Sequence, residues 1–416
     1  MNIFRFILFI LISSTVAINN VWGFGGTSFL GLSLKNAVFF SSFIVLFLMS
    51  LSSKKVSVVE IPSIIPLCIF VVIATFSIFY SKLFSAGIKL STITSLTEYK
   101  SKLIDPVFLY IAGCIIFNKK SNILTALKVL VVFYALMNIL ALLSFLTGHN
   151  LIGKAFLSHR GQRFSSFFSI ANQGAYALSF ILPLLYYYLI DKKHFINKVL
   201  FSILSICCIG GVLLTGSRGA YLLVPVQVVG FSLLTKNIRL FLFTIISGFL
   251  FALLLFILNP DFVTSALDRM LLFKASNLSE VSSGRTMVWQ GLLQIISNQP
   301  LAAVTGVGWG TYREHLINIF GMAPAAHNYY LKVWIEVGVV GLCILLFGVA
   351  NYIYKFRRMI RSSSPLLYQC CIFSFLALFW NTMLASLETY MLYYAWFIGL
   401  MTNFAIIQYK EIRQES

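Results

Sequence analysis

Runs of apolar residues long enough to cross a membrane recur along the chain, and they constrain its fold more than any other feature. A helix needs roughly 20 apolar residues to span the hydrocarbon core of a bilayer. Lipid cannot satisfy an exposed backbone, so such runs are expected to cross the membrane as helices. Only 10% of the residues are charged, whereas a soluble protein carries about a quarter. The sequence therefore predicts an all-α polytopic membrane protein.

About twelve transmembrane helices fit the chain, within one integral membrane domain over residues 1–416. The first run, which follows Arg5, also has the form of a secretory signal, but no small-residue cleavage site stands out, so we expect a retained anchor. The expected spans are 4–19, 36–52, 62–80, 104–118, 123–146, 170–190, 198–215, 220–235, 239–258, 328–350, 366–385 and 389–408.

The charge pattern predicts the orientation of these spans. The chain has 31 Lys and Arg against 12 Asp and Glu, and the basic residues gather in alternate loops, as at 119–120 and 355–361. Lys and Arg hold loops on the cytoplasmic side, so both termini are expected in the cytoplasm. The excess of positive charge then has a topological cause, and nucleic acid is not an expected partner.

The segment 259–327, on the outer side, is the longest connection between predicted spans. Connections longer than about 15 residues usually carry function. We therefore expect this large loop to contain short helices and part of a functional site.

Two arginines on the outer side stand at predicted helix starts. Arg218 lies in the reversal Thr-Gly-Ser-Arg-Gly-Ala at 215–220, where a guanidinium could bind phosphate oxygens or snorkel to lipid headgroups. Arg285 opens an amphipathic helix that we expect to lie on the membrane, capped by a serine and stopped before Pro300. A helix start favours anions, and an arginine there strengthens the site.

Two further residues are candidates on the same side. His327 lies in Ala-His-Asn-Tyr-Tyr-Leu at 326–331, where the long loop re-enters the membrane. Imidazole exchanges protons near neutral pH, so His327 could act as a base, although a helix cap is the alternative. Arg163 precedes the helix expected from residue 170 and adds another cation.

Several kinds of chemistry have no signature in the sequence. It contains no Asp-x-Asp pair for a divalent metal, no zinc spacing, no Walker loop and no Rossmann glycine pattern. No metal and no cofactor are expected. Glu336, inside the tenth span, is expected to have a structural partner, with proton transfer as the alternative.

The motifs together resemble the O-antigen ligase and O-antigen polymerase superfamily. The resemblance rests on Thr-Gly-Ser-Arg-Gly-Ala-Tyr at 215–221, Ser-Gly-Arg-x-x-x-Trp at 283–289, Gly-Val-Gly-Trp-Gly at 306–310, and His-Asn-x-x-Leu at 327–331, which Glu336, Gly338 and Gly341 follow. They occupy the second half of the chain, while the length and the predicted helical layout cover all of it.

The resemblance implies a glycosyltransferase of the GT-C type in the bacterial inner membrane, with its active site facing the periplasm. Such ligases transfer a glycan from undecaprenyl diphosphate to a sugar hydroxyl of lipid A-core, with inversion and without metal or ATP. Arg218 and Arg285 would hold the diphosphate, together with Arg163, which matches less closely. His327 would be the essential histidine near the acceptor.

Two other functions compete with the ligase. The O-antigen polymerase uses the same donor, with a second lipid-linked repeat as acceptor, and nothing in the motifs identifies the acceptor. A polysaccharide transporter or flippase would need charged or helix-breaking residues near the membrane midplane. The notable cations instead gather on one face, which favours a transferase that works among membrane lipids.

Overall fold

The computed structural model describes residues 3–21, 28–29, 32–52, 60–81, 92–149, 164–168, 170–191, 195–258, 260, 264, 284–322, 324–360, 365–384 and 391–415. These residues are almost entirely helical, which confirms the predicted all-α fold. One short hairpin departs from it, formed by β1 (Ser28–Phe29) and β2 (Leu32–Ser33) in antiparallel pairing.

The chain divides into two compact units, each built from separate stretches of sequence. Unit 1 comprises residues 1–45, 119–274 and 360–381, and unit 2 comprises residues 46–118, 275–359 and 382–416. Each unit is described by itself below.

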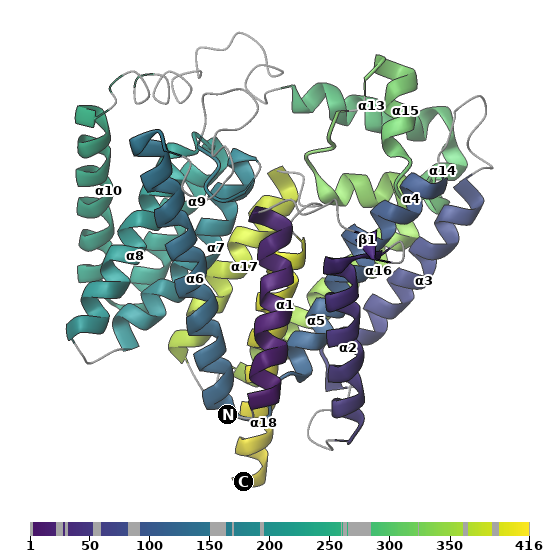
Figure 1. The fold of residues 1–416 in the computed structure, drawn as a ribbon. Helices are drawn as coiled ribbons and strands as arrows, with labels where there is room; N and C mark the ends of the chain where they lie inside the picture. The colour runs from purple at the N-terminus through teal and green to yellow at the C-terminus, as the bar shows by residue number, and fades with distance from the viewer. Residues whose placement is uncertain are drawn as a thin grey trace. The chain divides into compact units, whose positions relative to one another are not determined.

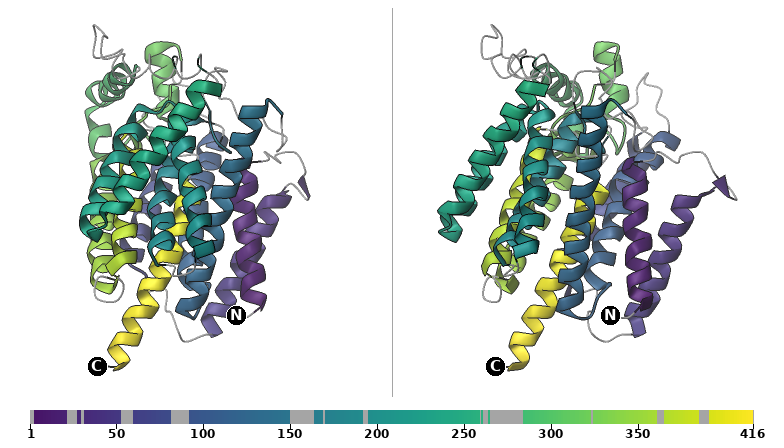
Figure 2. Two further views of the ribbon diagram at one scale, coloured as in Figure 1. Left: turned by 90° about the vertical axis from the view of Figure 1, so that its left-hand side faces the viewer. Right: turned by 60° about the vertical axis from the view of Figure 1, so that its left-hand side comes forward.

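Unit 1 contains α1 (Ile3–Val21), α6 (Lys120–Thr147), α7 (Ala171–Asp191), α8 (Phe195–Leu214), α9 (Arg218–Thr235), α10 (Ile238–Leu258) and most of α17 (Pro365–Leu384). Helices α6 to α10 run side by side, drawn in blue to teal in both views of Figure 2. Helix α2 (Leu34–Ser52) is shared between the units.

A proline inside α7 is compensated by a neighbouring helix. Pro183 has no N–H, so the carbonyl oxygen of Ser179, four residues earlier, loses its helical partner. The Gln227 side chain of α9 donates a 3.0 Å hydrogen bond to that oxygen and a 2.8 Å bond to the carbonyl oxygen of Phe373. These bonds satisfy backbone groups that lipid could not, and they join α7, α9 and α17.

Unit 2 contains α3 (Ile64–Tyr80), α4 (Thr92–Tyr99), a π-helical turn (Lys100–Ile104), α5 (Asp105–Ile115), α13 (Arg285–Asn298), α14 (Pro300–Thr305), α15 (Tyr312–Phe320), α16 (Tyr329–Ile360, ending at the unit boundary) and α18 (Met391–Glu415). The helices of the long loop, α13 to α15, are the green helices in the upper part of Figure 1. Their presence confirms that the loop contains short helices.

The structure adds a helix before the expected span 104–118. Residues 92–115 form one continuous helical segment through α4, the π-helical turn and α5. Ion pairs stabilise this segment, with Lys102 2.7 Å from Glu98 and Lys100 2.9 Å from Asp105. The sequence did not predict this helix, because its polar residues do not form an apolar run. In the structure these charged residues pair along the helix surface.

Each of the twelve expected spans coincides with a helix. Eight of these helices are long and apolar enough to cross a membrane, and shorter apolar helices occupy Ile3–Val16, Asn36–Met49 and Ile64–Tyr80 among the described residues. The protein is therefore a multi-pass membrane protein. Twelve crossings and the cytoplasmic placement of both termini stay predictions.

Candidate functional site

The turn between α8 and α9 places Arg218 at the first position of α9. Gly216 has a φ of 60° and reverses the chain, and Ser217 is the extended residue before the helix. The Ser217 N–H donates a 3.3 Å hydrogen bond to the Thr215 hydroxyl, and both residues are buried. Because this buried hydrogen bond fixes the turn, the half-buried Arg218 is held beside the first N–H groups of α9.

Arg285 occupies the equivalent position in unit 2, as the first residue of α13. The residue before it is Gly284, with a φ of 78°, and it forms the N-cap without a side-chain hydrogen bond. The predicted serine cap is therefore wrong. A glycine with positive φ lets the chain approach the helix at an angle that a side chain would resist.

The apolar face of α13 packs against protein. Val288, Leu292 and Ile295 are buried, together with Tyr312 and Leu316 of α15 and with Ile335 of α16. The neighbouring Leu293 lies outside this face and is 46% exposed. The helical spacing of these residues thus reflects packing within unit 2, and contact between α13 and the membrane stays a prediction.

His327 lies directly before α16 in a strained backbone conformation. Its φ is 53°, in the left-handed region that few residues other than glycine adopt. The next residue, Asn328, caps the helix, since its side-chain oxygen accepts a 3.0 Å hydrogen bond from the Leu331 N–H. His327 is half-buried and adjoins the cap, so capping is performed by its neighbour.

Ala326, the residue before His327, is held through both of its backbone polar groups. The Trp289 indole of α13 donates a 2.9 Å hydrogen bond to the carbonyl oxygen of Ala326. The Ala326 N–H donates a 3.4 Å bond to the hydroxyl of Tyr312, which also accepts a 3.1 Å bond from the Arg313 guanidinium. Ala326 and Tyr312 are buried.

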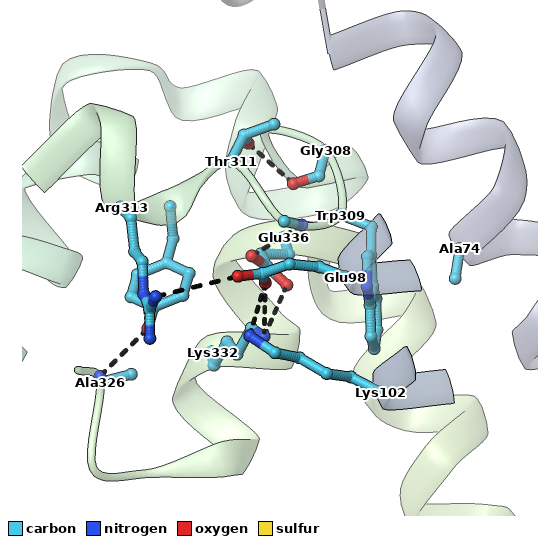
Figure 3. Close-up of polar contacts among 12 residues, drawn as sticks. Ala74, Glu98, Lys102, Gly308, Trp309, Thr311, Arg313, Ala326, Lys332 and Glu336 are labelled. Atoms are coloured by element: carbon cyan, nitrogen blue, oxygen red, sulfur yellow. Dashed lines mark hydrogen bonds and ion pairs between the residues drawn. The ribbon is translucent and has the colours of Figure 1, made fainter. Parts of the chain in front are cut away.

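The glycine-rich segment 306–310 closes onto a break in α16. Gly338 interrupts that helix with a φ of 78°, so nearby carbonyl groups lose their helical donors. The N–H groups of Val307 and Gly308 replace those donors, at 2.8 Å from the Ile335 oxygen and 3.0 Å from the Glu336 oxygen. Figure 3 shows Gly308 and Trp309 of this loop, and Trp309 is fully buried.

Five charged residues gather beneath this loop (Figure 3), namely Glu98, Lys102, Arg313, Lys332 and Glu336. The fully buried Lys332 ammonium lies 3.5 Å from the Glu336 carboxylate and 3.9 Å from that of Glu98. It also faces the rings of Trp309 and Tyr312, 5.3 Å from each centroid. Glu336 thus has the structural partner we expected, and that partner is Lys332. Buried charges need such pairing, so these ion pairs hold α4, α15 and α16 together.

Glu314 and His315 of helix α15, outside the membrane-spanning segments, have shifted pKa values. Burial lowers the pKa of His315 to about 4, because a charged imidazole would lose its hydration. Burial also raises the pKa of Glu314, and the nearby Glu98 adds to that effect while Arg313 opposes it. His315 is therefore neutral at physiological pH and packs as part of the unit 2 core.

The structure brings two of the four predicted site residues into one unit. Arg285 begins the helix whose Trp289 contacts the residue before His327. Arg218 belongs to unit 1, and Arg163 lies outside the described residues.

The sequence analysis overlooked Lys332 and Tyr312. Lys332 and Glu336 are four residues apart inside an apolar helix. This spacing could have indicated the pair, because a lysine there needs a buried partner. Tyr312 had no comparable signal.

No group of three or more His, Cys, Asp or Glu side chains that could hold a metal ion occurs among the residues that the structure describes. Independence from metal stays a prediction.

Comparison with protein families gives one match. Residues 200–346 match the model of a family described as O-antigen ligase, which supports the resemblance to the O-antigen ligase and polymerase superfamily. The matched region contains Arg218, Arg285, Trp289, Lys332 and His327. No curated protein matches the chain.

Proposed function

We propose that this protein, a member of the O-antigen ligase and polymerase superfamily by its residues 200–346, is an O-antigen ligase. In this proposal it transfers a glycan from undecaprenyl diphosphate to a sugar hydroxyl of lipid A-core, at the periplasmic face of the bacterial inner membrane. The reaction inverts the anomeric carbon and uses neither metal nor ATP.

The observation that carries the proposal is the shared placement of two arginines. Arg218 and Arg285 are each the first residue of a helix, and a glycine of positive φ lies two residues before Arg218 and directly before Arg285. An arginine at this position is unfavourable beside the positive end of the helix dipole, unless an anion binds there. Backbone N–H groups and a guanidinium together suit phosphate oxygens.

These residues fit the chemistry of glycan transfer. When the acceptor oxygen attacks the anomeric carbon, the bond to the diphosphate breaks and negative charge grows on the leaving oxygen. Guanidinium groups fixed in advance stabilise that charge more in the transition state than in the ground state. His327 would remove the proton of the acceptor hydroxyl, which contributes about a hundredfold to ten-thousandfold.

The test is an acceptor assay with the purified protein. Undecaprenyl-diphosphate-linked glycan is offered with either lipid A-core or a second lipid-linked repeat, without ATP and with EDTA present. Glycan on lipid A-core supports the ligase. Elongation on the lipid carrier would make the protein a polymerase, and transfer to neither acceptor would contradict the proposal and favour a transporter. Transfer that EDTA abolishes would contradict metal independence.

A further inference from the structure

We infer that Trp289 and Tyr312 are positioning residues, which hold the Ala326–His327 backbone so that the imidazole is presented to the acceptor hydroxyl. The inference rests on the proposed function, and it assigns to two aromatic residues a role that acts through His327.

His327 needs contacts with surrounding residues to keep its backbone conformation. A non-glycine residue at a φ of 53° is in the left-handed region, where its side chain strains the backbone. Such a conformation persists only when surrounding contacts determine it. Asn328 fixes the chain on the far side of His327, through its 3.0 Å bond to the Leu331 N–H.

The chain before His327 is fixed through the N–H and the carbonyl oxygen of the buried Ala326. The oxygen of Ala326 accepts the Trp289 bond of 2.9 Å, and its N–H donates to Tyr312 at 3.4 Å. Two bonds in opposite directions restrict rotation of the peptide planes next to Ala326. His327 shares the 326–327 plane, so the Trp289 bond fixes the peptide group from which the His327 backbone continues.

Tyr312 and Trp289 are themselves held in place by the residues around them. Tyr312 is fully buried, and the Lys332 ammonium lies 5.3 Å from its ring centroid. Lys332 is in turn held by Glu336 and Glu98. Trp289 lies four residues after Arg285 on α13. The same helix therefore carries a residue that we assign to the diphosphate and one that fixes the base.

The chain offers a matched control for the tryptophan. The Trp334 indole donates a 3.0 Å bond to the carbonyl oxygen of Ala303 in α14, within the same unit. Replacing either tryptophan by Phe removes one indole–carbonyl bond and keeps an aromatic ring. Only the Trp289 bond reaches the residue before His327.

The first experiment measures amide hydrogen exchange of the full-length protein in detergent. Trp289→Phe and Tyr312→Phe are each expected to speed exchange in a peptide covering residues 324–330 by about tenfold or more, since each bond restrains one of the two peptide groups next to the Ala326 Cα. Trp334→Phe is expected to leave that peptide as in the wild type. Unchanged exchange in both Trp289→Phe and Tyr312→Phe would overturn the inference, and this readout does not depend on any transfer activity.

The second experiment separates kcat from KM in the acceptor assay. Trp289→Phe is expected to lower kcat by about 10-fold to 100-fold with KM for the lipid-linked donor within about twofold of the wild type, because misplacing a reacting group affects the rate of the chemical step. Trp334→Phe should keep kcat within about twofold. An equal loss in the two variants would indicate general destabilisation and contradict the inference.

A double variant tests whether Trp289 acts through His327. In a His327→Ala background, adding Trp289→Phe should cause less than about a twofold further loss, because the group being positioned is already absent. A further tenfold loss would show that Trp289 acts elsewhere. A wild-type protein without transfer activity would contradict the proposed function, while the exchange experiment would still decide the positioning role.

Discussion

The Glu336 carboxylate accepts a 2.8 Å hydrogen bond from the backbone N–H of Gly310, which lies 26 residues earlier in the chain. The same carboxylate is paired with Lys332 one turn away on α16. A single buried acid thus ties the glycine-rich loop to the helix that begins after His327. This connection leads to predictions for stability, and the helix starts and His327 lead to predictions for activity.

The buried pair Lys332–Glu336 should behave as a coupled unit. Lys332→Met or Glu336→Gln alone should cost about 3–5 kcal/mol of stability, because each leaves a buried charge with poorer compensation. The double variant should cost clearly less than the sum of the two. Thermal unfolding in detergent measures all three, and additive losses would contradict the coupling. Lys410→Met is the control, since its pair with Glu60 is exposed and should contribute less than about 1 kcal/mol.

The break in α16 should not tolerate a side chain. In Gly338→Ala, the new Cβ would lie 2.0 Å from the carbonyl oxygen of Val304, so the loop or the helix must shift. Gly321→Ala imposes a similar backbone strain, at a φ of 68°, but its Cβ would meet nothing within 4 Å. We expect about 1–2 kcal/mol of destabilisation for Gly321→Ala and a larger loss for Gly338→Ala. Equal unfolding temperatures for the two variants would refute the close packing at the break.

The stability of the protein should fall as the pH drops from about 6.5 toward 4. The folded state keeps His315 neutral with a pKa of about 4, whereas the unfolded chain binds a proton near 6.5. Protons therefore favour the unfolded state throughout that window. His315→Leu should flatten this part of the stability profile, measured by unfolding at a series of pH values. His149→Gln, at an exposed position, serves as the control, and an unchanged profile in His315→Leu would contradict the assignment.

Each arginine at a helix start should be needed for transfer. Arg218→Ala and Arg285→Ala are expected to fold and to lose about 100-fold to 1,000-fold in kcat, by analogy with removing one donor to a developing anion. The corresponding lysine variants should recover part of the rate, because they restore the charge without the bidentate geometry. The acceptor assay and a thermal unfolding curve on each variant provide the measurements. Normal transfer by both alanine variants would refute the diphosphate site.

His327 should control both the rate and its dependence on pH. If the imidazole is the general base, kcat should fall in acid as His327 becomes protonated, and His327→Ala should lose about 100-fold or more. The residual rate of that variant should lack the acid limb of the profile. Activity that persists in His327→Ala with the wild-type pH profile would exclude the base role.

Local patterns were enough to predict the helices and several of their starts. The apolar runs placed a helix at each of the twelve expected positions, because hydrophobic length is a property of consecutive residues. The sequence likewise placed Arg218 and Arg285 at helix starts, where α9 and α13 begin. The family motifs within residues 200–346 are also local.

Only the tertiary structure decided which residues share a site. Glu98 meets Lys332 across more than 230 residues of sequence, and no periodicity encodes such a contact. Trp289 stood out in the sequence only as the last residue of the motif at 283–289, yet its indole nitrogen bonds Ala326 on another segment. A hydrogen bond or ion pair between distant segments depends on where the chain brings two side chains together, so sequence determined the elements and packing determined the support around His327.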